Sequence, residues 1–400
     1  MSRWPVVPLS AVVSPVDRSV PVLAGTAYRT IGVRWWGEGA YERITIDGSQ
    51  TAAKTLSVVR QGDLIINKIW VRHGSVAVAG EKVDGCAASG EFPTFQSDEN
   101  RMLPRWLHWI CRTKGFWSAC ADLSRGTSGK NRIRPERFLT ITIPLPPVDE
   151  QRRVVARIEA IQSRVDEGRA LRRQAERSSV ALISSARAAL VGVAPGADWV
   201  PLRSVLAEIE NGKSPQCLAR AANEDEWGVL KVGAVSFGQF DQRENKALPG
   251  GLGFNAAHEV RNGDFLVCRA NTAELVGACA IIPSTRPKLL LSDKTFRFHF
   301  LPDAEIIPEW LDHTLKSPAL RAQIERAASG TSPTMKNISK EKVMSLLMPP
   351  HSRSRQVQVV AELGRLDRGV GTMKRLQGAT AAELDAMLPA ILDRAFRGDL

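Results

Sequence analysis

The two halves of the sequence repeat the same short motifs in the same order. Seven segments of the first half have a counterpart in the second half, and the distance between partners rises from 193 to 206 residues without a reversal. The matched pairs are Val7–Leu9 with Val200–Leu202, Gly39–Glu42 with Gly238–Asp241, Arg60–Ile66 with Arg261–Val267, Pro104–Leu107 with Pro308–Leu311, Gly126–Ser128 with Gly330–Ser332, Gln151–Ala156 with Gln356–Ala361, and Ala189–Gly192 with Ala395–Gly398. Because chance matches would scatter, we interpret the whole chain as a duplication, and a fold for it must contain one plan twice.

Each half mixes strand and helix patterns in one order. Short β-type runs follow a Gly-Asp turn at Leu64–Ile69 and at Phe265–Cys268. Pro104–Trp117 and Pro308–Ile324 have helical patterns with proline in the first turn, where its missing N–H costs nothing. A polar Gly-Thr-Ser loop, a strand, a pair of prolines and a long helix follow in both copies. The order predicts an α+β fold with two duplicated domains.

The proline pairs mark the entry into the long helices. Pro146-Pro147 and Pro349-Pro350 cannot continue a strand ladder, and their backbone suits the first turn of a helix. Between these pairs the pattern predicts two domains and two spacer helices. Their boundaries are 1–147 for the first domain, 148–192 for the first helix, 193–350 for the second domain and 351–400 for the second helix.

Both long helices carry an apolar stripe. In Glu150–Leu190 the stripe slips by three residues around Gly168, which is typical of a coiled coil with a stammer. In the second copy the stripe continues to Ala395, and Pro389 is predicted to begin a short last helix. Because neither stripe can remain exposed to water, we expect the two helices to pair antiparallel about a pseudo-twofold axis.

The charge balance points to a polyanionic partner. The chain has 54 Lys and Arg against 42 Asp and Glu, a net charge of +12, and the surplus is +9 in the first half (28 against 19) and +3 in the second (26 against 23). No segment combines a basic face with an exposed aromatic face, so the surplus favours nucleic acid over lipid. Pro5 and Pro8 interrupt the N-terminal apolar residues, and no apolar run reaches about 18 residues. We therefore expect a cytoplasmic protein with no membrane partner.

Motifs for catalysis, cofactors and metals are missing from the sequence. "GTSGK" at Gly126–Lys130 lacks the spacing of a phosphate-binding loop, and "GGLGFN" at Gly250–Asn255 breaks the dinucleotide-binding pattern. The six cysteines form no C-x-x-C pair, and the six histidines form no metal-binding pair, so free thiols and no metal site are predicted. The sequence favours a binding protein over an enzyme.

With its two mixed domains, "PLPPVDEQRRVVARIEAI" at Pro144–Ile161 and "LPAILDRAFRGDL" at Leu388–Leu400, the chain resembles the specificity subunit of Type I restriction-modification systems. The second copy departs from the pattern at Arg355-Gln356, where the first copy has Glu150-Gln151. The resemblance implies a non-catalytic DNA-binding subunit with two target recognition domains that read a bipartite, asymmetric site, held apart by an antiparallel coiled coil. It also implies two modification subunits that methylate adenine with S-adenosylmethionine, and restriction subunits that use ATP and Mg, with no cofactor on this chain.

Candidate DNA contacts lie in two pairs of loops. One pair follows the Gly-Asp strands and the other surrounds the Gly-Thr-Ser loops, where Arg and Asn suit base edges, and Lys and Thr suit phosphates. The candidates are Lys68, Arg72, His73, Arg125, Thr127, Lys130 and Arg132 in the first copy, and Arg269, Asn271, Thr331, Thr334, Lys336 and Asn337 in the second. Trp35, Trp36 and Trp70 fit either the core or a base-stacking surface, and ordinary burial tendencies favour the core.

Two other functions fit parts of the pattern. A stand-alone DNA nuclease or methyltransferase would need an acidic or S-adenosylmethionine-binding constellation, which no motif in the sequence provides. A duplicated DNA-binding or assembly scaffold would need no catalytic residue, and DNA binding that depends steeply on salt would argue against a scaffold whose domains bind only proteins.

Overall fold

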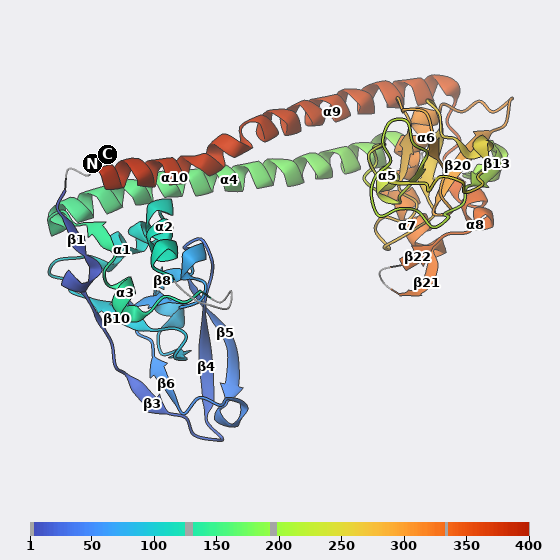
Figure 1. The fold of residues 1–400 in the computed structure, drawn as a ribbon. Helices are drawn as coiled ribbons and strands as arrows, with labels where there is room; N and C mark the ends of the chain where they lie inside the picture. Colours follow the sequence, from blue (N-terminus) through green and yellow to red (C-terminus); the bar gives the residue numbers. More distant parts are fainter. Residues whose placement is uncertain (1–3, 125–130, 193–197, 333–334, 400) are drawn as a thin grey trace. The chain divides into compact units, whose positions relative to one another are not determined.

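The structure is a computed structural model that describes residues 4–124, 131–192, 198–332 and 335–399. The chain divides into two compact units (Figure 1). Unit 1 consists of Met1–Arg172 and Gln377–Leu400, and unit 2 of Arg173–Leu376. The chain passes from the first unit to the second within a single long helix, α4 (Val148–Val191).

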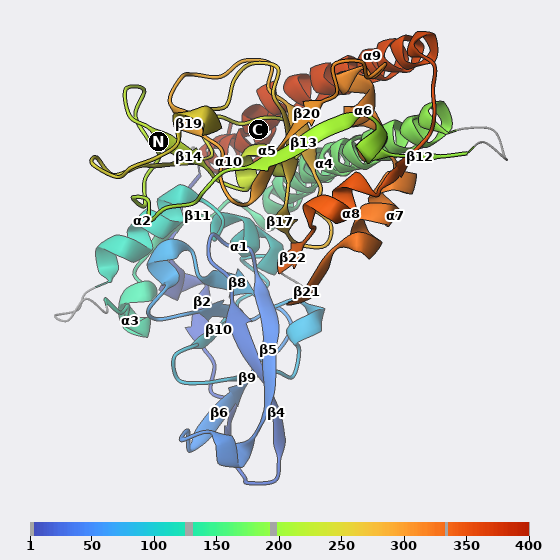
Figure 2. The same ribbon diagram turned by 90° about the vertical axis from the view of Figure 1, so that its right-hand side faces the viewer.

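The described residues of unit 1 form three small sheets. A four-stranded sheet has the order β2-β10-β7-β8, a five-stranded sheet the order β3-β6-β9-β4-β5, and β1 pairs with β11. Strands β4 and β5 extend as a long antiparallel ribbon (Figure 2). The elements are β1 (Val6–Pro8), η1 (Leu9–Ala11), β2 (Val13–Pro15), β3 (Ser19–Pro21), β4 (Ala27–Val33), β5 (Ala40–Asp47), η2 (Gly48–Gln50), β6 (Thr55–Val58), β7 (Leu64–Ile66), η3 (Val71–His73), β8 (Val76–Val78), η4 (Glu81–Val83), β9 (Ala87–Ala88), β10 (Thr94–Ser97), α1 (Pro104–Ile110), α2 (Lys114–Leu123), α3 (Pro135–Phe138) and β11 (Thr142–Pro144).

Unit 2 repeats the four-stranded sheet and changes what surrounds it. Its order β13-β20-β16-β18 matches β2-β10-β7-β8, and β12 pairs with β23 as β1 pairs with β11. Two three-stranded sheets, β15-β14-β19 and β17-β22-β21, replace the five-stranded one. The elements are β12 (Val200–Pro201), η5 (Leu202–Ser204), β13 (Leu206–Asn211), β14 (Gly228–Leu230), α5 (Gly233–Ser236), β15 (Asn245–Ala247), η6 (Ala256–His258), β16 (Phe265–Cys268), β17 (Ala270–Asn271), β18 (Cys279–Ile281), β19 (Leu289–Leu290), β20 (Thr295–Phe300), α6 (Pro308–Leu315), α7 (Pro318–Ala327), β21 (Ser329–Ser332), β22 (Met335–Asn337), α8 (Lys340–Met344) and β23 (Leu347–Met348).

The Gly-Asp turns start equivalent buried strands. Gly62 and Gly263 have φ of +89° and +88°, a conformation that favours glycine. The aspartate that follows accepts the backbone N–H of residue 60 in unit 1 (2.8 Å) and of residue 261 in unit 2 (2.9 Å). Each aspartate also pairs with an arginine, Asp63 with Arg18 at 2.6 Å and Asp264 with Arg297 at 2.9 Å. The turn therefore delivers the chain into β7 or β16 at the centre of the four-stranded sheet.

A buried glutamine joins each globular part to its long helix. The Gln151 side chain accepts a hydrogen bond from Leu103 N–H at 2.9 Å and donates to the carbonyls of Arg101 and Pro146 at 2.7 and 2.8 Å. In unit 2, Gln356 has the same three kinds of partner, residues 307, 305 and 351, at 2.8 to 2.9 Å. Both side chains are buried. The repeated "Q" of the two proline-helix motifs is thus a structural connection between loop and helix.

The long helices complete the core of each unit. In unit 1, α4 contributes Val154 and Ile158 to a cluster with Trp106, and α10 (Ala381–Arg397) contributes Leu388 and Leu392 to the same cluster. In unit 2 the last residue of α4, Val191, packs in a cluster with Trp310, and α9 (Arg353–Ala379) adds Val359 and Leu363. The apolar stripes are therefore used partly for packing against the globular parts.

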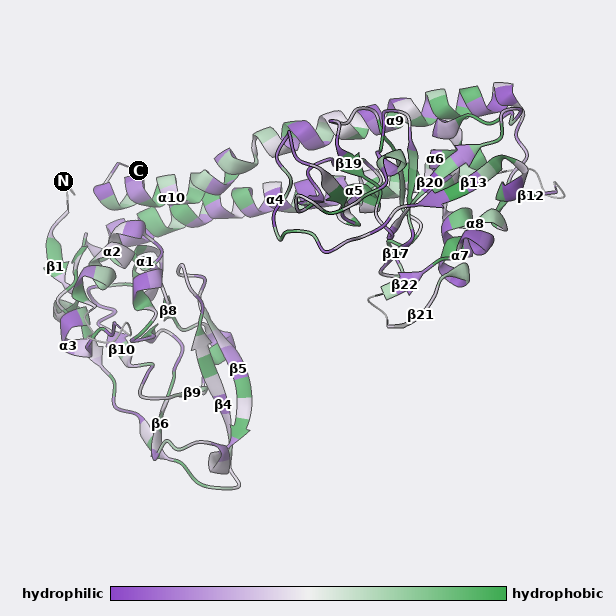
Figure 3. Ribbon diagram, turned by 45° about the vertical axis from the view of Figure 1, so that its right-hand side comes forward, coloured by the Kyte–Doolittle hydropathy of each residue, from purple (hydrophilic) through white to green (hydrophobic). Residues whose placement is uncertain are grey.

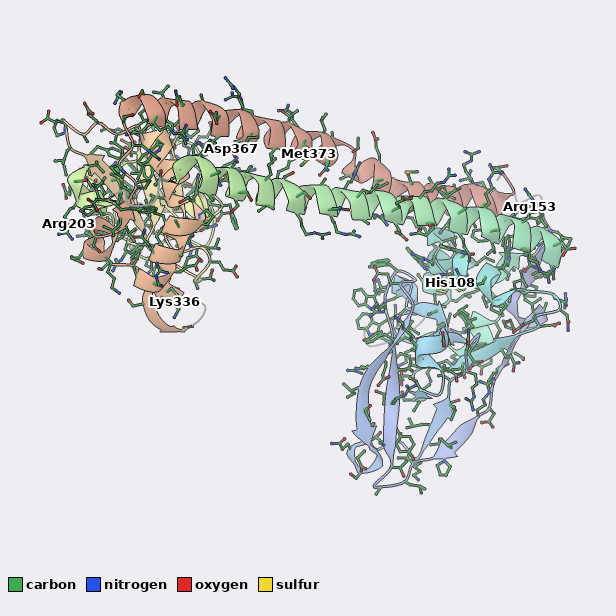
Figure 4. All side chains as sticks on the ribbon, turned by 180° about the vertical axis from the view of Figure 1, so that it is seen from behind. His108, Arg153, Arg203, Lys336, Asp367 and Met373 are labelled. Atoms are coloured by element: carbon green, nitrogen blue, oxygen red, sulfur yellow. The ribbon has the colours of Figure 1, made fainter. Side chains whose placement is uncertain are left out.

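Polar contacts show the direction of the helix pairs within each unit. In unit 1, Arg169 forms an ion pair with Asp385 at 2.8 Å, and Arg172 donates to Thr380 Oγ1. In unit 2, Ser179 Oγ lies 3.6 Å from Met373 Sδ, and the Arg187–Asp367 pair spans 3.6 Å; Figure 4 labels Met373 and Asp367. Within each unit, positions that advance along α4 meet positions that recede along α9 or α10, so the helices run antiparallel there.

The start of α9 caps the end of α4. Arg355 donates to the carbonyl of Leu190 at 3.2 Å, and His351 Nε2 lies 2.9 Å from the carbonyl of Val191. A positive side chain is favourable at the carbonyl end of a helix. Arg355, which stands where the first copy has Glu150, therefore caps the carboxyl end of α4 in unit 2. Glu150 instead pairs with Arg153 on its own helix.

The last helical segment begins earlier than the sequence predicts. Pro389 lies inside α10, and the break between α9 and α10 falls at Thr380. The prediction that Pro389 begins the last helix is wrong, because Leu388 and Leu392 on either side pack in the core of unit 1 and hold the helix through the proline. Gly168 does not interrupt α4.

The long helices contain both hydrophilic and hydrophobic residues. Hydrophilic and hydrophobic residues alternate along α4, α9 and α10 (Figure 3). Among the residues that the structure describes, none of the helices combines the length and apolar composition needed to cross a membrane.

Candidate nucleic-acid interface

In unit 1 the two predicted loops meet beside one acidic residue. Lys68, in the turn after β7, accepts the N–H of Ile133 on its carbonyl at 2.9 Å and donates its own N–H to Glu91 at 3.0 Å. Arg132 forms an ion pair with the Glu91 carboxylate at 3.2 Å. The structure therefore brings Lys68 and Arg132 together, although 64 residues separate them. Arg125, Thr127 and Lys130 lie outside the described residues.

Unit 2 joins the corresponding loops by the corresponding hydrogen bond. Ile338 N–H donates to the carbonyl of Arg269 at 3.1 Å, as Ile133 donates to Lys68. Strand β17 pairs with β22, which places Ala270 opposite Asn337 and Asn271 opposite Lys336. In both units, then, the loop after the Gly-Asp strand and the segment after the Gly-Thr-Ser loop form one surface.

Two of the predicted DNA contacts in unit 2, Asn271 and Arg269, already bond to other residues of the protein. Asn271 donates to Ser236 Oγ at 2.9 Å and accepts the Thr272 N–H at 2.8 Å. Arg269 donates to the Asp293 carbonyl at 3.2 Å and lies over the Phe296 ring. These bonds position the loop, and they leave the two side chains less free to contact bases.

The β21–β22 hairpin carries Lys336, one of the two predicted cations of unit 2. Lys336 is half-buried on β22 and donates to the Gly330 carbonyl at 2.7 Å (Figure 4). Asn337, next to it, accepts on its carbonyl from Ser329 Oγ at 3.5 Å. Thr331 belongs to β21, its side chain lies outside the description, and Thr334 lies outside the described residues.

Arg72 and His73 belong to an aromatic surface of unit 1. His73 stacks on Trp35 with ring centroids 5.3 Å apart, and Arg72 lies 5.8 Å from the Trp70 ring centroid. Trp35, Trp36 and Trp70 are 44%, 50% and 38% exposed. The prediction that these tryptophans belong to the core is wrong, because they pack on one another and on His73 while remaining partly exposed.

One basic cleft of unit 2 has no signal in the sequence. Lys231, Lys246 and Lys294 line a cleft of about 410 Å³ together with Ser214 and Cys217. Lys231 lies 3.6 Å from Glu244 and Lys294 lies 3.4 Å from Asp293. Burial raises the pKa of the Cys217 thiol, and the charge of Lys246 opposes that effect. The lysines come from separate segments with no common spacing, so only the tertiary fold brings them together.

The chemistry available on these surfaces is that of binding. Lys and Arg side chains suit phosphates, and the exposed indole rings suit the faces of bases. Among the described residues, no three His, Cys, Asp or Glu side chains are grouped so that they could hold a metal ion.

Burial, with smaller contributions from Arg105 and Arg112, lowers the pKa of His108 on α1 to about 4 (Figure 4).

Comparisons with known proteins place these observations in a family context. The specificity subunit of the Type I restriction enzyme EcoEI from Escherichia coli is 33% identical over 205 residues, which cover 50% of this chain and 34% of that protein. The EcoKI specificity subunit from Escherichia coli K12 is 27% identical over 333 residues, which cover 78% of this chain and 68% of that protein. The match thus spans about a third of the first relative's length. No family model matches the sequence.

Solved structures share the fold over nearly the whole chain. The HsdS subunit from Thermoanaerobacter tengcongensis aligns over 99% of this chain and 97% of its own length, with 24% identity and a TM-score of 0.58. A chain from a structure that concerns complex assembly and conformational transition of the type I R-M system aligns over 99% and 98%, with 24% identity and a TM-score of 0.73. By sequence and by fold, the chain resembles these subunits.

Proposed function

We propose that this chain, a relative of Type I restriction-modification specificity subunits by sequence and fold, is the DNA-specificity subunit of such a complex. It reads a bipartite, asymmetric DNA site and directs adenine methylation and restriction by partner subunits. The observation that carries the proposal is the repeated surface in which the loop after the Gly-Asp strand joins the segment after the Gly-Thr-Ser loop. Two such surfaces in one chain suit two half-sites.

The differences between the units support an asymmetric site. The four-stranded sheets agree, but unit 1 surrounds its sheet with the β4–β5 ribbon, and unit 2 has the β21–β22 hairpin and the lysine cleft. Sequence is read by side chains that reach the edges of bases, and the two units present different side chains there. We therefore expect two different half-site sequences.

The long helices support a spacer between the two target recognition domains. α4 has 44 residues and is continuous, which corresponds to about 66 Å of helix. The antiparallel contacts within each unit agree with an antiparallel coiled coil. A stiff spacer would hold the distance between half-sites constant.

The partners and cofactors of the proposal belong to other chains. Two modification subunits would bring S-adenosylmethionine, and restriction subunits would bring ATP and Mg. This chain would contribute recognition and no catalysis, so its own residues bind phosphates and bases. Arg132, which is exposed, and Lys336, which is half-buried, are the predicted cations to which we assign phosphate contacts.

Reconstitution with a modification subunit tests the proposal. We expect the chain alone to transfer no methyl group from radiolabelled S-adenosylmethionine to DNA, the modification subunit alone to transfer little, and the complex to methylate adenine. Sequencing of the methylated DNA should give one site with two half-sites and a constant spacer. Methylation by this chain without a partner, or the same methylated sites with and without it, would contradict the proposal.

Substitution of the cations gives a second, independent measurement. Lys336→Ala should weaken DNA binding by the complex at all sequences and lower the slope of binding against salt concentration, because one phosphate contact is lost. Lys374→Ala, an exposed lysine on α9, is the matched control and should leave binding unchanged.

A further inference from the structure

An exposed aromatic ring occurs at a similar place in both units. Trp36 is 50% exposed and Phe237 is 80% exposed. Each directly precedes a glycine in the left-handed region, Gly37 with φ of +68° and Gly238 with φ of +74°. A single exposed apolar side chain is common on protein surfaces and needs no functional explanation. An exposed aromatic ring at similar positions of both duplicated units is less expected by chance.

The packing of the two glycines relates the two positions. A Cβ on Gly37 would lie 2.7 Å from the Arg112 side chain, and a Cβ on Gly238 would lie 3.3 Å from the Lys316 side chain. Arg112 and Lys316 each stand eight residues after the proline that begins α1 or α6. The sequence match aligned Gly238 with Gly39, whereas the packing aligns it with Gly37.

Both rings adjoin the candidate nucleic-acid interface of their own unit. Trp36 N–H donates to the carbonyl of His73 at 2.8 Å, which joins the tryptophan to the loop after β7. In unit 2, Ser236, the neighbour of Phe237, accepts the hydrogen bond from Asn271, which stands opposite Lys336. In each unit, hydrogen bonds at the ring-bearing residue or its neighbour therefore connect it to a segment with predicted DNA contacts.

The setting in unit 1 is rigid and strained. Trp36 has φ of +56°, which is uncommon for a bulky residue and costs free energy. The bonds from Trp36 to His73 and from Gly37 to Gly74 hold it there. The ring lies edge to face with Trp35 at 6.4 Å and with Trp117 at 5.4 Å, so it is fixed in place before a ligand arrives.

The charges around the rings favour an anionic partner such as DNA over a basic or neutral surface. Arg72 lies over Trp70, and Arg34 lies 4.5 Å from the Tyr41 ring centroid; Glu38 is the acidic residue of the same loop. Beside Phe237, Lys316 donates to the Gly238 carbonyl at 2.9 Å and pairs with Asp312 at 2.6 Å. An aromatic face flanked by cations is the arrangement that stacks on bases next to phosphates.

We propose that Trp36, supported by Trp35 and Trp70, and Phe237 stack on nucleobases of the bound DNA, one ring for each half-site. This inference rests on the proposed function and adds a contact of a different kind to it. Side chains that enter between base steps unstack them at a cost, so such rings favour DNA that is already distorted. Each unit would then recognise the deformability of its half-site as well as base edges.

The test uses the full-length chain and two fluorescent 30-base-pair duplexes of one mixed sequence, one fully paired and one with a central three-base mismatch. We expect the natural chain to bind the mismatched duplex more tightly. Trp36→Asn and Phe237→Ala should each weaken that binding roughly five- to 150-fold and reduce the preference for the mismatch. Asparagine is chosen because it tolerates the left-handed backbone. The slope of binding against salt should stay the same, because the rings carry no charge.

Controls separate stacking from loss of fold. Phe254→Ala removes another exposed ring of unit 2, one that lies against Trp227, and Leu23→Ala removes an exposed apolar side chain of unit 1; both should bind as the natural chain does. Trp36→Tyr and Phe237→Tyr should keep the mismatch preference, because a ring remains. Thermal unfolding of every variant identifies any that fails to fold. If Trp36→Asn or Phe237→Ala fails to fold, the mismatch preference of the tyrosine variants tests the stacking.

Other outcomes would overturn the inference. Variants that bind both duplexes as the natural chain does would show that the rings do not stack on bases. Variants that bind DNA normally but no longer associate with a modification subunit would show that the rings form a protein interface, again with the proposed function intact. The proposed function itself would be overturned if neither the natural chain nor its complex showed salt-dependent binding to either duplex.

Discussion

Two glutamines at equivalent positions illustrate how single residues maintain both copies. Gln151 connects the loop before α1 to the start of α4 through three hydrogen bonds. Gln356 connects the loop before α6 to the start of α9 in the same way. A buried amide is suited to this, because it accepts and donates at once. The loops that it fixes contain none of the predicted DNA contacts, so we expect it to contribute to stability.

Gln151→Ala should lower the free energy of unfolding by roughly 1–3 kcal/mol, because a buried N–H and two carbonyls lose their partner. Gln356→Ala should have a similar effect on unit 2. Urea denaturation followed by circular dichroism measures both. Gln174→Ala on α4, which replaces an exposed glutamine, is the matched control and should change little. Equal stability of Gln151→Ala and Gln174→Ala would contradict the role.

Glu210 links strand β13 to β20 through charged partners. It accepts hydrogen bonds from Arg297 at 2.6 and 2.8 Å and lies 2.9 Å from His299 Nε2. Burial by itself raises the pKa of Glu210, but the hydrogen bonds with His299 and Arg297 outweigh it and lower the pKa below its usual value of 4.5. The carboxylate form is therefore the one that stabilises the fold.

The lowered pKa of Glu210 predicts a dependence on pH. Its contribution should be fully present above about pH 4.5, the unfolded value, and should be lost as the pH falls through the lower folded value. Glu210→Gln should cost roughly 1–3 kcal/mol at pH 7, and this difference from the natural chain should shrink toward pH 3. Urea midpoints between pH 3 and 7 measure it. Glu208→Gln, exposed on the same strand, should show no such trend; a difference for Glu210→Gln that is constant with pH would contradict the assignment.

At the scale of elements, α10 contains a residue that disfavours its own helix. Pro389 cannot donate the hydrogen bond to residue 385, and its ring crowds the preceding turn. Leu388 and Leu392 nevertheless pack in the core of unit 1, while Pro389 itself is exposed. Packing of the apolar face thus overrides local propensity, as it does in most helices of globular proteins.

Pro389→Ala should therefore raise the free energy of unfolding by roughly 1–3 kcal/mol, since the helix gains a hydrogen bond and loses a poor helix former without losing packing. Pro308→Ala at the first turn of α6 is the control, and it should change stability little because proline is tolerated there. Thermal and urea denaturation compare the variants. A lower stability of Pro389→Ala would show that the unit needs the proline.

At the scale of the whole molecule, the proposal assigns α4 and the α9–α10 segment to a spacer between two DNA-reading units. The chain leaves unit 1 at Arg172 and returns to it at Gln377. An insertion at these two points leaves the contacts inside both units unchanged. The length of the spacer can therefore be altered without altering a reading loop.

Insertion of one heptad after Arg172 and another before Gln377 should keep the apolar stripes in register and add about 10 Å of helix. DNA rises about 3.4 Å per base pair along one strand, so the spacer in the methylated site should lengthen by about three base pairs. Both half-site sequences should remain, although the added rotation of the duplex is expected to weaken binding. Methylation mapping of the reconstituted complex measures this. An unchanged spacer, or changed half-sites, would contradict the spacer role.

Much of the architecture follows from local patterns in the sequence. The ordered repeats, the Gly-Asp turns, the proline pairs and the apolar stripes predicted two similar α+β halves and the long helices, because turn chemistry and periodicity act over a few residues. The same reasoning placed Lys68, Arg132 and Arg269 near the candidate interface, but the predicted loop around Gly330–Ser332 and Lys336 is wrong, because these residues belong to strands β21 and β22. Pro389 shows the limit, since its local signal for a helix start was overridden by distant packing.

The tertiary structure alone decided which of these loops meet and which side chains remain free. The hydrogen bonds from Ile133 to Lys68 and from Ile338 to Arg269 connect residues more than 60 positions apart, and the lysine cleft joins three separate segments. Exposure of Trp36 and Phe237 depends on what else fills the core beneath them, and the engagement of Asn271 depends on Ser236. These are long-range contacts, and no local periodicity encodes them, because each is chosen by the free energy of the whole fold.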